Sequence, residues 1–156
     1  MNRIRRTLSL SFLAVAAAGA LPGAGNALLG AQAATVTVHD AWVREAPAGR
    51  KVTAAFLVAE NPGKSPRSIV SATSDAAETV ELHEMKQVGS TMEMSPVKSI
   101  EVPAGGKTEL KPGGLHVMMF GLKKPLAEGD TVMVTLVLDN GTKVNVAAQV
   151  RKPKGM

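Results

Sequence analysis

Residues 131–150 have the pattern of a β-hairpin, and this pattern indicates what the whole chain can fold into. Every second residue is apolar over 131–138 and again over 143–150, which is the period of a strand with one buried face. Between them, Asp139-Asn140-Gly141 is a turn sequence typical of hairpins. From residue 35 onward, no segment shows a convincing run of apolar residues at helical spacing, so we expect strands throughout.

The rest of the chain repeats this arrangement, with short apolar segments separated by turns that contain glycine and proline, such as Asn61-Pro62-Gly63. Short strands over roughly 120 residues predict an antiparallel β-sandwich or barrel. The predicted strands cover residues 35–44, 52–60, 67–73, 79–84, 99–102, 108–110, 115–122, 131–138 and 143–150.

The first 33 residues are predicted to be a secretory signal peptide. Three arginines precede an apolar run over residues 8–21, and small residues lead to Ala31-Gln32-Ala33, an A-x-A cleavage pattern. We expect cleavage after Ala33, with Ala27 as the weaker alternative, and a single domain over 34–156. The pair Arg5-Arg6 leaves twin-arginine export open, although plain export is favoured. The apolar run is too short to span a bilayer, so we expect a periplasmic protein with no membrane insertion after cleavage.

Composition excludes some classes of function. The chain has 18 Lys and Arg against 13 Asp and Glu. Three of these arginines belong to the predicted signal peptide, which leaves the mature domain with 15 positive and 13 negative side chains. This balance does not indicate nucleic-acid binding. The chain contains no cysteine, which excludes a lipoprotein anchor on this sequence and also a blue-copper site, because that site needs a thiolate ligand.

Two His-x-Met pairs carry the chemistry of the sequence, namely His83 with Met85 and His116 with Met118. On a strand, residues two apart point to the same face, so each pair places an imidazole beside a thioether. The same alternation predicts that Val117 packs in the core while His116 lies on the opposite face. Paired imidazole and thioether ligands suit a soft metal ion, and Cu(I) first.

Methionine is usually a core residue that fills gaps, but its distribution here is uneven. Five of the six internal methionines of the mature domain lie between positions 85 and 119, among them Met92 and Met94, which share a face if 91–94 is extended. Zinc rarely uses methionine, and no G-x-S-x-G motif supports a hydrolase. A copper-dependent redox enzyme and a metal-free interaction module remain alternatives. Trp42 is predicted to be a core residue.

The chain resembles the periplasmic copper chaperone family PCuAC, which is marked by the pattern H-x10-M-x21-H-x-M. The segments 40–44, 113–119 and 125–130 also resemble that family, so that the resemblance covers residues 36–150. His39 has no place in the pattern, and we expect it to be an exposed strand residue. All four positions of the pattern match in type and spacing: His83, Met94, His116 and Met118.

The resemblance implies a cupredoxin-like antiparallel β-sandwich that binds one Cu(I) per chain through these four residues. It also implies delivery of copper towards the CuA centre of cytochrome c oxidase, often beside a Sco-type thioredoxin-like protein. We therefore expect a carrier that works by ligand exchange rather than an enzyme. Some relatives carry a tail rich in His and Met. The tail 151–156 has no histidine, so we expect no second site there.

Overall fold

The computed structural model describes residues 35–153, and the predicted signal peptide lies outside these residues. The described residues form ten strands and no helix, so they include no helix long and apolar enough to cross a membrane. The strands are β1 (Thr37–Arg44), β2 (Val52–Asn61), β3 (Arg67–Ser74), β4 (Ala77–Val88), β5 (Thr91–Pro96), β6 (Ile100–Val102), β7 (Gly106–Leu110), β8 (Leu115–Leu122), β9 (Thr131–Leu138) and β10 (Lys143–Arg151).

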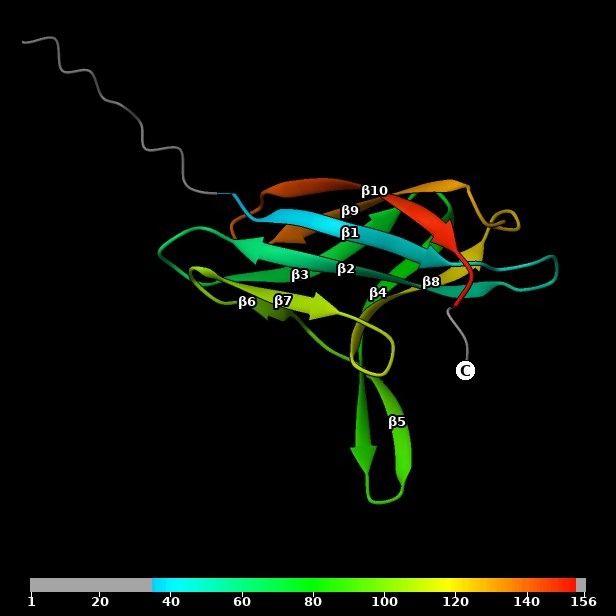
Figure 1. The fold of residues 1–156 in the computed structure, drawn as a ribbon, viewed down its shortest axis with the longest axis horizontal. Coiled ribbons are helices and arrows are strands. Elements are labelled where there is room, and N and C mark those ends of the chain that lie inside the picture. Colours follow the sequence, from blue (N-terminus) through cyan, green and yellow to red (C-terminus); the bar gives the residue numbers. More distant parts are fainter. Residues whose placement is uncertain (1–34, 154–156) are drawn as a thin grey trace, which may run out of the picture. The chain divides into compact units, whose positions relative to one another are not determined.

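The strands form one hydrogen-bonded sheet that folds over on itself (Figure 1). The strand order is β5-β4-β8-β2-β1-β10-β9-β3-β6, and β7 pairs with β2. Strands β3 and β4 are far apart in this order and still contact each other, as expected when the two halves of a sheet enclose a core. The predicted all-β sandwich is confirmed. Its single parallel pair joins β1 to β10, two strands that no short turn connects.

The core between the two layers is aliphatic, and period-two alternation supplies its residues. Strand β10 alternates as predicted, with every second residue from Val146 to Val150 buried. Strand β8 contributes Val117 and Met119, both fully buried. A continuous core of this kind stabilises a domain that has no cysteine to cross-link it. The buried residues of β9 are Val132, Val134, Leu136 and Leu138, each 3% exposed or less.

Strand β4 differs most from the sequence-based expectation. The predicted strand ends at residue 84, whereas β4 continues to Val88 and pairs with β5 as a hairpin that projects from the body of the domain (Figure 1). The difference has a simple cause. Residues 86–88 and all of β5 are exposed, so this part of the hairpin has no buried face to impose an apolar alternation.

The end of the last strand also differs slightly from expectation. The predicted last strand ends at residue 150, but Arg151 also belongs to β10 and pairs with Arg44 of β1. This pairing brings a basic residue of the last strand beside the first strand. Residues 154–156 lie outside the described part of the chain.

Candidate metal centre

The histidines of the two His-x-Met pairs lie side by side on neighbouring strands. His83 of β4 is the direct cross-strand partner of His116 of β8, and their ring centroids are 5.9 Å apart. Both lie on the face opposite to the core residues Leu82 and Val117, as predicted. They are nevertheless buried, with 8% and 4% of their surface exposed, because further side chains cover this second face.

Aromatic residues form much of this cover. The Phe56 ring lies 6.3 Å from the ring of His116, and Phe120 lies 5.9 Å from His83. The ring of Trp42 packs against that of Phe56, with their centroids 4.5 Å apart. Trp42 is half-buried and is not part of the main core. The prediction for Trp42 is therefore wrong. Alternation explains the result, because the neighbouring residue Val43 takes the inward position. Phe56 and Phe120 thus lie beside the two imidazoles, and Trp42 extends this aromatic cluster from Phe56.

Each imidazole is fixed through one of its two nitrogens. Nε2 of His83 lies 2.9 Å from the Glu81 carboxylate, and Nδ1 of His116 lies 2.9 Å from the carbonyl oxygen of Gly114. A carboxylate and a carbonyl can only accept hydrogen bonds, so these two nitrogens carry the protons and donate. In the neutral rings, the lone pairs must then lie on Nδ1 of His83 and Nε2 of His116.

Those two lone-pair nitrogens are buried and have no hydrogen-bond partner within the described residues. A buried polar atom without a partner costs about 1–3 kcal/mol, so two of them in one site require an explanation. A metal ligand supplies one, because a metal-binding histidine commonly donates its other N–H to a carboxylate or a backbone carbonyl. The hydrogen bonds of His83 and His116 follow this pattern.

The surroundings of His116 also favour the neutral ring that a metal requires. Burial lowers the pKa of His116 below its ordinary value of 6.5. The hydrogen bond to Gly114 opposes this effect, whereas the charges of His83 and Arg44 add to it. The result is an imidazole that stays unprotonated below the pH at which a free histidine becomes charged.

Thioether groups line a cavity of about 240 Å³ beside His116, to which Met85, Met94 and Met118 all contribute. Met94 lies directly opposite Met85 in the β4–β5 register. Of the four residues in the sequence pattern, the cavity therefore brings together His116, Met94 and Met118. His83 is not part of its lining and joins the group through its contact with His116. The two thioethers of the sequence pattern and the imidazole of His116 are donors of the kind that Cu(I) prefers.

The described residues contain no metal site built from histidine, cysteine and carboxylate ligands alone. Across residues 35–153, no group of three or more His, Cys, Asp or Glu side chains is placed to hold a metal ion. Any metal bound at the paired histidines would therefore depend on thioether sulfur, which hard cations avoid. The chemistry of the donors fits a soft monovalent ion.

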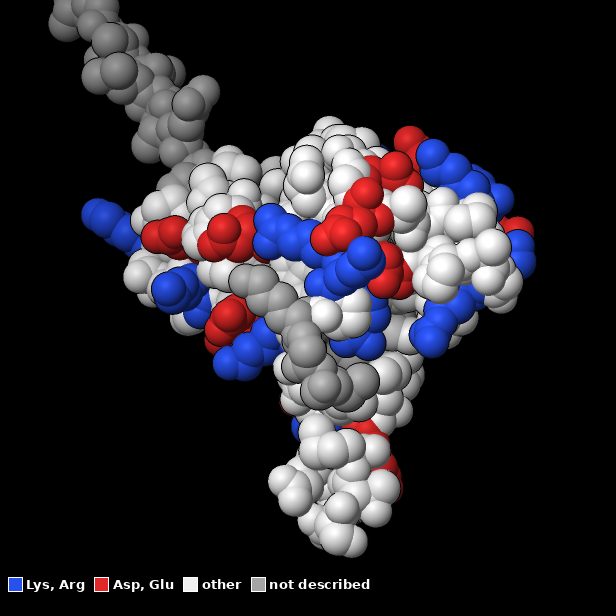
Figure 2. Space-filling model, turned by 45° about the vertical axis from the view of Figure 1, so that its right-hand side comes forward, with Lys and Arg blue, Asp and Glu red and all other residues white. Residues whose placement is uncertain are grey.

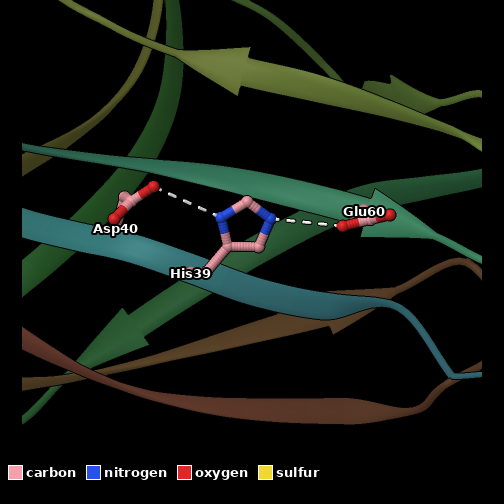
Figure 3. Close-up of polar contacts among 3 residues, drawn as sticks. All are labelled: His39, Asp40 and Glu60. Atoms are coloured by element: carbon pink, nitrogen blue, oxygen red, sulfur yellow. Dashed lines mark hydrogen bonds and ion pairs between the residues drawn. The ribbon is translucent and has the colours of Figure 1, made fainter.

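Two further residues of the sequence analysis do not join the centre. His39 is an exposed residue of β1, as predicted, and its ring lies between the carboxylates of Asp40 and Glu60 at 3.4 and 3.3 Å (Figure 3). Met92 is 47% exposed near the outer end of the β4–β5 hairpin. In Figure 2 the tip of the projecting hairpin is uncharged, and acidic side chains are visible along one edge above it.

Several residues around the centre belong to none of the sequence motifs. Glu81 lies two residues before His83, and the strand alternation places both on one face, which was the only available signal for their hydrogen bond. Arg44 lines the cavity with its guanidinium 5.8 Å from the centre of the Phe56 ring, and its Nε has no partner among the described residues. No motif marks Arg44, because the contact joins different strands.

The fold and the centre define a domain of the PCuAC type. Solution structures of DR1885 from Deinococcus radiodurans are similar to this chain. The Cu(I) form is 38% identical with a TM-score of 0.59, covering 80% of this chain and 83% of DR1885. The apo form is 32% identical with a TM-score of 0.60, covering 98% and 97%. The copper-bound PCuAC domain from PmoF2 has a TM-score of 0.63 over 76% of this chain and 93% of that domain, and at 19% identity it shows the fold alone.

The chain belongs to the LpqE-like family, which residues 36–150 match. A relative from Leifsonia xyli subsp. xyli, Lxx21020, is 40% identical over 127 residues, which cover 81% of this chain and 75% of the relative. Both names describe lipoproteins, whereas the present sequence contains no cysteine to carry a lipid. The resemblance to PCuAC proteins is thereby confirmed at the level of family and fold.

Proposed function

We propose that this protein is an extracytoplasmic copper(I) chaperone that binds one Cu(I) per chain through His83, Met94, His116 and Met118. The observation that carries this proposal is the pair of buried imidazole nitrogens that have no hydrogen-bond partner among residues 35–153, on neighbouring rings beside a cavity lined by thioethers. The Cu(I) form of DR1885, which is 38% identical to this chain, supports the choice of metal.

The donor set suits transport of copper rather than catalysis. Two neutral imidazoles and two thioethers hold Cu(I) without adding negative charge, and soft sulfur favours the monovalent ion. Met94 is 46% exposed, so a partner can approach the ion from the side of this ligand. Thiolates of the partner would displace the ligands one at a time. No bond in a substrate is made or broken, and the protein is therefore not an enzyme.

We further propose that the protein acts in the periplasm and passes copper towards the CuA-bearing subunit of cytochrome c oxidase, directly or beside a Sco-type thioredoxin-like protein. The predicted signal peptide and the family membership support export. The recipient follows from the resemblance to PCuAC proteins, and a transfer assay with each candidate recipient would test it separately from copper binding.

An anaerobic competition titration against a chromophoric Cu(I) chelator tests the binding site. The mature protein from Ala34 is compared with a Met94→Leu, Met118→Leu double variant. Met133→Leu is the matched control, because Met133 is a 46% exposed methionine of β9, a strand of the other half of the sheet. We expect one tight equivalent in the wild type and in the control, and its loss in the double variant.

Two outcomes would contradict the proposal. Failure of the folded wild type to compete for Cu(I) would remove the chaperone function and leave the methionines with a packing role. Turnover of the copper-loaded protein with an electron donor would instead favour a copper-dependent redox enzyme on the same fold.

A further inference from the structure

We infer that Met85 is a fifth copper-contacting residue, the thioether through which Cu(I) enters and leaves the four-ligand site. The inference rests on the proposed function, because it concerns the same ion. Met85 is outside the H-x10-M-x21-H-x-M pattern. Among the described methionines outside that pattern, it is nevertheless the only one that lines the cavity of the proposed ligands.

The strand register places Met85 among the proposed ligands. It follows His83 by two residues on β4, so the two side chains share a face. Across the hairpin, its direct partner is Met94. The pairing of β4 with β8 brings Met85 level with the residues just before His116. Met85 therefore has a proposed ligand on its own strand, one on β5 and one on β8.

One carbonyl oxygen fixes Met85 relative to His116. The backbone N–H of Met85 donates to the oxygen of Gly114 at 3.1 Å, and Nδ1 of His116 donates to the same oxygen at 2.9 Å. The main chain at Met85 and the orientation of the imidazole thus depend on a single acceptor. The side chain that follows from this main-chain position lines the same cavity as the ring of His116, where the two could share an ion.

The cavities show why Met85 acts in exchange rather than as a permanent ligand. Met85 lines the cavity that contains His116, Met94 and Met118, and His83 does not. It also lines a second cavity of about 800 Å³, beside Trp42 and Arg44. Met85 is the only one of these five donors that lines both cavities, so the second cavity gives a route to the ion that passes its sulfur.

The exchange step involves no change of oxidation state. A sulfur lone pair of Met85 forms a bond to Cu(I) while one of the four ligand bonds breaks, so that the ion keeps its coordination number. Departure towards a partner repeats the step, with a thiolate of the partner replacing the next ligand. Removing Met85 should therefore slow transfer while leaving the four-ligand state intact.

Two measurements on the mature protein test the inference. In the first, methionine methyl groups labelled with ¹³C are followed by NMR during anaerobic addition of Cu(I) to one equivalent. We expect the Met85 methyl signal to shift or broaden together with those of Met94 and Met118, while the signal of Met133 stays in place. In the second, stopped-flow mixing with a chromophoric chelator gives the rate of copper release.

For the rate measurement, Met85→Leu is compared with Met133→Leu. Leucine is close to methionine in volume and has no sulfur, so both variants should fold. We expect release from Met85→Leu to slow by about tenfold, which corresponds to a barrier higher by about 1.4 kcal/mol. The equilibrium affinity should change by less than about threefold in either variant.

Four results separate failure of this inference from failure of the proposed function. If the methyl signals of Met94 and Met118 respond while that of Met85 does not, the site stands and the role of Met85 is overturned. Equal release rates in the two leucine variants would overturn it as well. A loss of affinity in Met85→Leu as large as that in Met94→Leu would make Met85 a permanent ligand. If no methyl signal responds, the proposed function itself fails.

Discussion

Met118 and Met119 are neighbours in the chain and lie on opposite faces of β8. Met119 is fully buried in the core, whereas Met118 faces the metal centre and lines its cavity. We therefore propose separable roles for these two identical side chains, one in folding and one in binding. The separation follows from the two-residue period of the strand.

Substitutions at these two positions should affect different properties. Met119→Ala removes a fully buried side chain and should lower the free energy of unfolding by about 2–5 kcal/mol. Met118→Leu keeps the volume and should cost less than about 1.5 kcal/mol, while it weakens Cu(I) binding. Urea denaturation and the chelator titration measure the two effects. The reverse assignment, with a stable Met119→Ala or full copper affinity in Met118→Leu, would contradict the proposed site.

Glu81 should tune copper binding through His83 without contacting the ion. Its carboxylate accepts the Nε2 hydrogen of His83 at 2.9 Å and so keeps the lone pair on Nδ1. Loss of such a partner typically costs 10–100-fold in metal affinity, so Glu81→Ala should weaken Cu(I) binding by at least about tenfold. NMR of the imidazole nitrogens would report the change of tautomer.

The matched control for this experiment is Glu84→Ala. Glu84 lies on the same strand but on the other face, where it pairs with Lys86 at 2.8 Å. Copper affinity in this variant should equal that of the wild type. Equal losses in both variants would show that the effect arises from the net charge of the strand rather than from the hydrogen bond to His83.

The sequence predicted the strands more completely than it predicted the environment of the site. Period-two alternation located the central residues of most strands. It also placed His83 and His116 each on one face of a strand, and the structure shows that these faces are adjacent. The register between distant strands is not written in any local pattern. It decides that Phe56 of β2 and Trp42 of β1 extend the row that begins at the two histidines.

For the same reason, alternation alone did not predict that the two histidines would be buried. Alternation says which side of a strand a residue occupies, but it does not say whether that side is covered. Strands β2 and β8 carry buried residues on both faces. The second face is covered by aromatic residues that lie far apart in the sequence and come together only in the fold.

Protonation of His116 should destabilise the copper-free protein in mildly acidic solution. Because the folded state lowers the pKa of His116 below 6.5, the unfolded chain binds this proton more readily than the folded one. The free energy of unfolding should therefore be highest above pH 6.5. It should fall as the pH decreases from 6.5 to the lowered pKa, and then stay level with respect to this group.

Urea denaturation of the copper-free protein between pH 8 and pH 5 measures this effect. A His116→Gln variant lacks the titrating group and should show a smaller slope over the same interval. The neighbouring side chains whose charges act on the pKa of His116 are His83 and Arg44, and they remain in the variant. Identical slopes in both proteins would show that His116 does not cause the pH dependence.

Arg44 should hold the pKa of His116 down through its charge. Its guanidinium is among the groups that lower this pKa, so Arg44→Gln should raise it relative to the wild type, as measured by NMR titration of the His116 ring protons in the copper-free protein. Arg50→Gln is the control, because Arg50 lines the same cavity and is not among the causes of the shift. If both variants raised the pKa equally, the effect would come from the overall charge of the cavity. If neither did, burial and the charge of His83 would account for the lowered pKa without Arg44.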